Sequence, residues 1–176
     1  LFKEANLETP SELFAKGEWT WEKFAEVAKV ITETGEGNIG YVHIDEISTN
    51  PWRLLVPIMQ AYGGGSWDPT GAKCLMSNPE SIQAASLVHK MMYEDNSIVK
   101  PNEKVDFTSG NVGMTMRQLS WLSSLKDVGF SWDFAPLPSG PAGPNAVVGQ
   151  AAVVVFNTSP NKDVAADFLK FLMNTE

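Results

Sequence analysis

Apolar residues recur through residues 20–34 at the spacing of one face of an amphipathic α-helix. Thr20 precedes this run and can cap the helix through its hydroxyl. Trp19 lies five positions before Phe24, which is the separation of a hydrophobic staple, so we interpret it as a packing residue. The face that we expect to be buried consists of Trp21, Phe24, Ala28 and Ile31.

Similar patterns predict three further helices. The first follows Pro51 and ends at the glycines 63–65, the second is capped by Asn78 or Ser77, and the third occupies residues 159–174. The expected buried stripes are Ile82, Ala85, Val88 and Met92 in the second of these helices, and Ala165, Phe168, Leu169 and Leu172 in the third.

Alternating or continuous apolar runs predict strands over residues 40–44, 112–116, 130–135 and 146–156. The last run is almost free of polar residues, as in a strand that is buried on both faces. A turn at residues 68–71 predicts a surface hairpin. Strands and helices are interspersed without an internal repeat, so the predicted fold class is α/β.

Composition narrows the range of binding partners. The formal net charge of −8 disfavours nucleic acids and anionic membrane surfaces, because both attract a cationic face. The single cysteine, Cys74, cannot form an internal disulfide, and no apolar run approaches the ~20 residues that span a bilayer. A chain that begins at Leu1, without methionine, is expected to be a piece of a longer protein.

The residue patterns of common enzyme sites are missing from the sequence. It contains no Gly-x-Ser-x-Gly motif, and the glycines 63–65 are not followed by the Lys-Ser or Lys-Thr of a phosphate-binding loop. Most acidic residues stand near predicted helix starts or in turns, with Asp133 as the exception. Two histidines and no Cys-x-x-Cys pair make zinc unexpected. We therefore expect no catalytic residue, no metal and no cofactor.

Aromatic, planar polar and small residues gather instead at the ends of predicted elements. An indole ring offers an apolar face to a sugar ring, amide and guanidinium groups bond adjacent hydroxyls, and glycine lets the backbone approach a ligand. For Trp52 and Trp121 a packing role is an equal alternative, because tryptophan is usually largely buried. The candidate ligand-binding residues are Trp121, Trp52, Arg53, Gln118, Arg117, Ser120, Gly149 and Gln150.

Five segments, in the right order, resemble the family 1 extracellular solute-binding proteins of bacterial ABC importers, the maltose-binding-protein-like group. Three positions depart from the family's pattern: Asn6 and Gln150 replace usual glycines, and Gly113 replaces a usual alanine. In addition, the usual glycine shortly before Trp121 is absent. The five segments are LFKEANLETP, WTWEKFAEVAKVIT, FTSGNVGMTMRQLSW, FAPLPSGPAGPNAVVGQAAVVV and SPNKDVAADFLKFL.

The resemblance implies a type II periplasmic-binding-protein-like lobe, with a mixed sheet flanked by helices, from an incomplete two-lobe protein. Residues 1–148 would form the second lobe. Residues 149–176 would be a crossover strand and helix that belong to the first lobe in the intact protein. In this family the ligand lies in the cleft between the lobes, and the end of the strand 112–116 is then a cleft wall.

The resemblance also implies roles for the candidate residues. Trp121 matches the aromatic residue that stacks on the sugar, and Trp52 and Arg53 match a region with a second cleft group. Gly149 and Gln150 match backbone close to the ligand. Arg117, Gln118 and Ser120 accompany Trp121 at its strand end.

The implied function is capture of a sugar or oligosaccharide and its delivery to the permease subunits of an ABC importer. Such proteins lie outside the cytoplasmic membrane, as periplasmic proteins or as lipoproteins. Two alternatives stay open: another polar solute, such as a polyamine, glycerol phosphate or a peptide-like compound, and a glycan-active enzyme fragment. A phosphate ligand would need more cationic groups than Arg53 and Arg117 supply. In the isolated chain we expect the apolar stripe of the last helix either to fold back on this lobe or to pair with a second copy of the chain.

Overall fold

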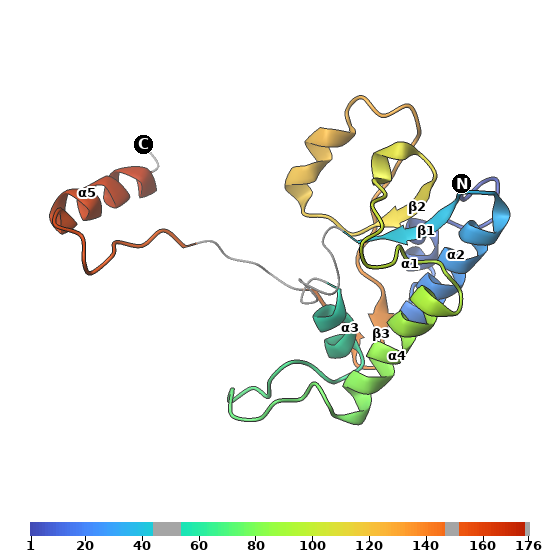
Figure 1. Ribbon diagram of the computed structural model, residues 1–176, viewed down its shortest axis with the longest axis horizontal. Helices are drawn as coiled ribbons and strands as arrows, with labels where there is room; N and C mark the ends of the chain where they lie inside the picture. Colours follow the sequence, from blue (N-terminus) through green and yellow to red (C-terminus); the bar gives the residue numbers. More distant parts are fainter. Residues whose placement is uncertain (44–53, 147–151, 175–176) are drawn as a thin grey trace.

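The computed structural model describes residues 1–43, 54–146 and 152–174, and within them helices and short strands alternate (Figure 1). This arrangement confirms the α/β class. The helices are α1 (Pro10–Ala15), α2 (Trp21–Thr34), α3 (Leu55–Ala61), α4 (Pro79–Tyr93) and α5 (Lys162–Met173), with the 3-10 helices η2 (Phe107–Ser109) and η3 (Leu119–Leu125). The strands are β1 (Ile39–Val42), β2 (Val112–Thr115), β3 (Ser139–Gly140) and β4 (Gly143–Pro144).

Helix α2 provides the centre of the hydrophobic core. The predicted face is buried, and the Phe24 ring contacts Trp21 and Tyr41 edge-on, with centroid separations of 5.4 and 5.1 Å. Trp19 is also buried and packs against Phe24 at 5.9 Å, which confirms the predicted staple. The Thr20 hydroxyl accepts a hydrogen bond from the Lys23 backbone N–H at 3.2 Å, as predicted for the N-cap.

We expect Thr20→Ala to lower the free energy of unfolding by about 1 kcal/mol, because it leaves one N–H at the start of α2 without its side-chain acceptor. Urea unfolding of the complete protein measures the change. Thr34→Ala is the matched control, since Thr34 lies at the exposed other end of the same helix. Equal losses in the two variants would contradict a specific capping role.

Strands β1 and β2 form a parallel pair in which Ile39 pairs with Val112 and Tyr41 with Met114. Gly40 allows β1 to lie directly on α2, because a side chain there would overlap the carbonyl group of Ala28. The ladder therefore fixes the position of the β2 end relative to the core. The short antiparallel pair β3–β4 forms a separate sheet, so the described residues contain one parallel and one antiparallel pair and no single mixed sheet.

The buried face of α4 differs from the predicted stripe. Ile82 is 54% exposed, whereas Ser81 is fully buried and its hydroxyl accepts a hydrogen bond from the Gly65 N–H at 3.1 Å. This polar contact turns the helix so that its buried face starts one residue earlier than the apolar spacing indicated. The buried residues of α4 are Ser81, Ala84, Val88, Met91 and Met92.

The predicted strand over residues 130–135 is wrong. This segment passes α1 without entering a ladder and is held by side chains instead. The Ser11 hydroxyl donates to the Asp133 carboxylate at 2.8 Å, and the Trp19 indole N–H donates to the Pro136 carbonyl at 3.0 Å. Asp133, the unexplained acidic residue of the sequence, thus has a structural contact.

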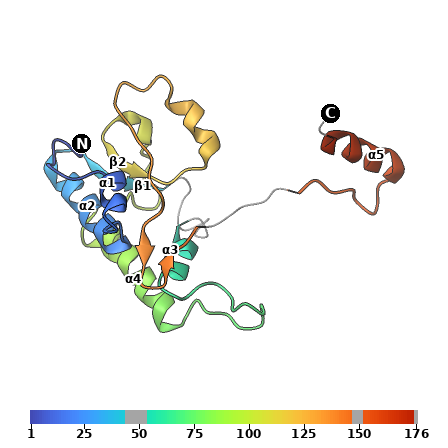
Figure 2. The same ribbon diagram turned by 180° about the vertical axis from the view of Figure 1, so that it is seen from behind.

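The predicted strand over residues 146–156 is also wrong in its described part, since residues 152–156 form no strand and are mostly exposed. These residues have no neighbouring strand in the described ranges, so an extended apolar run lacks the partner that would make it a strand. Helix α5 forms as expected, but none of its residues is buried. Figures 1 and 2 show it well apart from the other helices.

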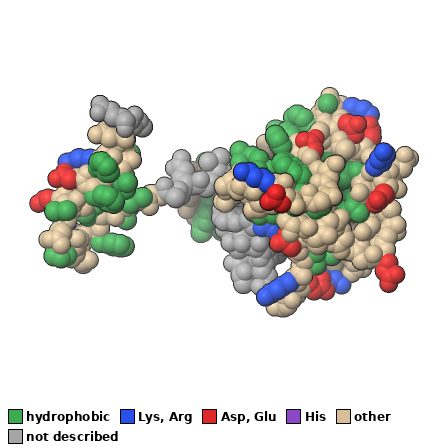
Figure 3. All heavy atoms as spheres, turned by 90° about the horizontal axis from the view of Figure 1, so that it is seen from above, with side chains coloured by type: hydrophobic (Ala, Val, Ile, Leu, Met, Phe, Trp, Pro, Cys, Tyr) green, Lys and Arg blue, Asp and Glu red, His purple; other side chains and the backbone are tan. Residues whose placement is uncertain are grey.

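The apolar side chains of α5 are exposed, with Phe168 at 57% and Phe171 at 74%. Figure 3 shows them gathered on the C-terminal segment, beyond the main body of the chain. Across residues 1–43, 54–146 and 152–174, no helix combines the length and apolar character needed to cross a membrane.

Candidate functional site

The end of β2 brings four of the predicted site residues together. Arg117 lies two residues after the last residue of the strand, Thr115, and Gln118 then serves as the N-cap residue of η3. The Trp121 backbone N–H donates to the Gln118 carbonyl at 2.9 Å, so that η3 returns the indole towards the strand end. Gln118 and Ser120 are exposed, whereas Arg117 and Trp121 are half-buried. Polar groups at this strand end are thus available to solvent beside a partly covered ring.

Two side chains contact the Trp121 ring, and a third packs on one of them. The Arg117 guanidinium carbon lies 4.7 Å from the centroid of the indole, over its face. Phe107 of η2 packs edge-on against the indole at 6.0 Å, and Phe130 packs on Phe107 at 5.6 Å. We call Phe107, Arg117, Trp121 and Phe130 the aromatic platform.

The platform is supported by the cap of η2. The Asp106 carboxylate accepts hydrogen bonds from the Thr108 N–H at 2.9 Å and from the Thr108 hydroxyl at 2.8 Å. These bonds hold the pKa of Asp106 below its usual value, with a smaller contribution from the positive charge of Arg117. Asp106 therefore stays ionised and balances part of the charge of the guanidinium.

On its inner side the platform meets the core through Tyr41 of β1. Burial raises the pKa of the Tyr41 hydroxyl well above its usual value, and the nearby charge of Arg117 opposes that rise. The hydroxyl lies 2.8 Å from Nδ1 of His43. Nε of Arg117 is buried and has no hydrogen-bond partner among the described residues. The guanidinium is therefore placed more by stacking and charge than by hydrogen bonds at this atom.

The other four predicted site residues, Trp52, Arg53, Gly149 and Gln150, lie outside the described residues. Sequence analysis missed the supporting residues Asp106, Phe107 and Phe130. The Asp-x-Thr pattern at residues 106–108 is a local capping signal that could have identified the first of them. The ring contacts of the other two join residues 14 and 23 positions apart and have no local signal.

One further hollow lies away from this strand end. It has a volume of about 210 Å³ and lies where α1 and the start of α2 meet the segment leading to β3 and β4. Its lining is largely apolar, with one hydroxyl from Ser139, so it lacks the several polar groups that orient a ligand. The lining residues are Phe14, Gly17, Trp19, Leu137, Ser139 and Pro144. In the described ranges no group of three or more His, Cys, Asp or Glu side chains is placed to hold a metal ion.

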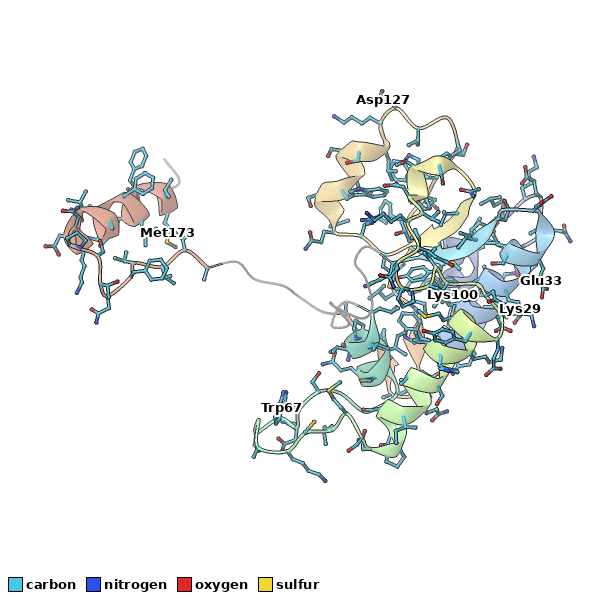
Figure 4. All side chains as sticks on the ribbon, in the orientation of Figure 1. Lys29, Glu33, Trp67, Lys100, Asp127 and Met173 are labelled. Carbon is cyan, nitrogen blue, oxygen red and sulfur yellow. The ribbon has the colours of Figure 1, made fainter. Side chains whose placement is uncertain are left out.

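Trp67 lies on the hairpin between α3 and α4, which projects away from the platform (Figure 4). Its ring is 62% exposed, and its backbone forms an isolated antiparallel bridge with Cys74, so the predicted hairpin is present without full strands.

We expect Trp67→Ser to leave ligand affinity unchanged, because this ring contacts no group of the platform. Calorimetric titration of the complete protein and of the variant measures this affinity. A tenfold loss of affinity would instead place this hairpin at the ligand.

Comparisons with known proteins add to this geometry. The family model for bacterial extracellular solute-binding proteins matches residues 1–176. Among curated proteins, none matches the chain. The chain is similar in structure to an ABC transporter solute-binding protein of Thermotoga lettingae bound with α-D-tagatose, with a TM-score of 0.78 at 20% identity, covering 98% of this chain and 45% of that one.

Two other solved structures share the fold. One is an ABC substrate-binding protein of Listeria monocytogenes in complex with cycloalternan, with a TM-score of 0.72 at 15% identity, covering 99% of this chain and 44% of that one. The other is UgpB of Mycobacterium tuberculosis in complex with glycerophosphocholine, with a TM-score of 0.65 at 18% identity. This match covers 81% of this chain and 35% of that one. The chain therefore spans less than half of each of these proteins.

Proposed function

The chain belongs to the bacterial extracellular solute-binding proteins, and from that premise we propose that the complete protein captures a sugar or oligosaccharide for an ABC importer. Proteins of this family bind solutes and are not enzymes. The observation that carries the sugar proposal is the half-buried Trp121 ring at the end of β2, beside the exposed Gln118 and Ser120. A flat apolar ring next to hydrogen-bonding groups suits the alternating C–H and hydroxyl surfaces of a sugar.

The charges around the platform support a neutral ligand. Arg117 stacks on Trp121 and lies near the ionised Asp106, which makes this position less favourable for an anion than an unaccompanied guanidinium would be. A phosphate-bearing solute is the second candidate, because UgpB shares this fold and is in complex with glycerophosphocholine. That candidate would need cationic groups from elsewhere in the complete protein.

A thermal-shift panel on the complete protein separates the two candidates. It contains D-tagatose, maltotriose, cycloalternan, glycerol 3-phosphate and glycerophosphocholine. We expect at least one sugar to raise the melting temperature and the two phosphate compounds to leave it unchanged, because only a ligand that binds the folded state stabilises it. A shift with a phosphate compound alone would favour the second candidate.

The two-part division of the chain is part of the proposal. Residues 1–148 would be the second lobe, and residues 149–176 would cross over and contribute a helix to the first lobe. The exposed apolar face of α5 supports this division, because such a face is normally covered in a folded protein. The cleft would then lie between the lobes, with the end of β2 as one wall.

The remaining parts of the proposal follow from the family. The complete protein would act outside the cytoplasmic membrane, in the periplasm or as a lipoprotein, and would deliver its ligand to the permease subunits of the importer. Loss of uptake of the bound sugar in a strain that lacks the protein, together with normal uptake of an unrelated sugar, is the expected result.

A further inference from the structure

Arg117 resembles a ligand-binding group in the sequence, but its surroundings assign it to another task. Its guanidinium carbon lies 4.7 Å from the centre of the Trp121 indole, over the ring face. At this distance the cation is attracted by the electron-rich face of the ring. One face of the indole is therefore already occupied, while Phe107 holds the ring from its edge at 6.0 Å.

The guanidinium also lies close to the core. Its Nε is buried, and its positive charge helps to lower the pKa of Asp106 and opposes the rise in the pKa of Tyr41. Tyr41 is fully buried on β1, so the inner side of Arg117 lies near the interior of the fold. The planar guanidinium of Arg117 lies over the Trp121 indole and therefore restricts the tilt of that ring.

We propose that Arg117 is a positioning residue for Trp121: its guanidinium covers one indole face, so that a ligand can stack only on the opposite face. The statement about the ligand rests on the proposed function, whereas the statement about the orientation of the Trp121 ring in the free protein does not. Arg117 presets the orientation of Trp121 before binding, and this reduces the ordering that binding would otherwise require.

The first test needs no ligand. Acrylamide quenching of indole fluorescence is measured on the complete protein and on Arg117→Met, each against its own Trp121→Phe partner, so that the difference reports Trp121 alone. We expect Trp121 to be quenched more strongly in Arg117→Met, because the covered face becomes open. Equal quenching of Trp121 with and without the guanidinium would overturn the proposal.

Two further variants separate stacking from charge. Arg117→Lys keeps the charge but loses the plane, and we expect quenching between that of wild type and that of Arg117→Met. Lys126→Met removes an exposed charge at the end of η3 and should change nothing. If Lys126→Met matched Arg117→Met, net charge rather than stacking would explain the effect, and the proposal would fail.

The second test uses the panel sugar that binds, measured by calorimetry. Arg117→Met should weaken binding by about 3- to 10-fold, the range for losing a partly desolvated cation–π contact. The loss should vanish in a Trp121→Leu background, which has no ring for the guanidinium to stack on, because the residue acts through the indole. Equal losses of affinity in both backgrounds would show direct ligand contact and overturn the proposal.

Failure of the whole panel to bind would contradict the proposed function. The quenching experiment would still decide whether Arg117 covers the indole of Trp121.

Discussion

Replacing Trp121 with alanine in the complete protein is expected to weaken sugar binding by about 1–3 kcal/mol, or roughly 5- to 150-fold, the scale for losing a buried aromatic contact. The ring is half-buried at the end of β2, and its supports come from η2 and from Arg117 rather than from the central core. The fold should therefore survive the change. Calorimetric titration measures the affinity, and circular dichroism checks the fold.

The same experiment decides between the two roles left open for this tryptophan. Phe130→Ala is the matched control, because it removes a ring that packs on Phe107 and does not contact the indole directly. A smaller loss of affinity in the control is expected. Unchanged affinity in Trp121→Ala, together with a large loss of thermal stability, would make Trp121 a packing residue only.

The isolated chain of residues 1–176 is expected to bind sugar more weakly than the complete protein by roughly two orders of magnitude or more, because half a cleft supplies only part of the contacts and cannot exclude water. It should also self-associate, since the apolar face of α5 is exposed. Titration with the sugar and light scattering over a range of concentrations measure the two effects.

A paired variant links self-association to α5. Phe168→Ser with Leu172→Ser should make the isolated chain monomeric, because both exposed side chains belong to the apolar stripe of this helix. Met76→Ser, which removes an exposed apolar side chain from the hairpin, should leave association unchanged. A monomeric chain that binds as tightly as the complete protein would show that the site lies within one lobe.

Sequence patterns correctly predicted the elements that depend on contacts between residues close together in the chain. The Thr20 cap, the Trp19–Phe24 staple and the parallel-paired strands near residues 40 and 112 all appear where apolar spacing and capping residues indicated. The errors arise where a distant contact decides the structure. Ser81 turns α4 through its bond to Gly65, and Ser11 binds Asp133 from 122 positions away.

For the candidate site, the sequence indicated which residues lie close together but not how they are arranged. The sequence indicated that Arg117, Gln118, Ser120 and Trp121 share a strand end, because they follow an alternating apolar run. It did not indicate that Arg117 stacks on the indole, or that Phe107 holds the ring, since both depend on how η2 and η3 fold back onto the strand. The strand expected at residues 146–156 is absent from its described part for a different reason, since the described part of the chain offers it no partner.

The close contact between Gly40 and α2 links the position of the candidate site to the interior of the protein. Because the backbone of β1 lies against Ala28 without an intervening side chain, the helix acts as a fixed reference surface for the strand pair. A larger residue at position 40 would push β1 away from α2 and, through the ladder, would shift the β2 strand that leads to Trp121. The position of the candidate site relative to the core thus depends in part on a residue without a Cβ atom.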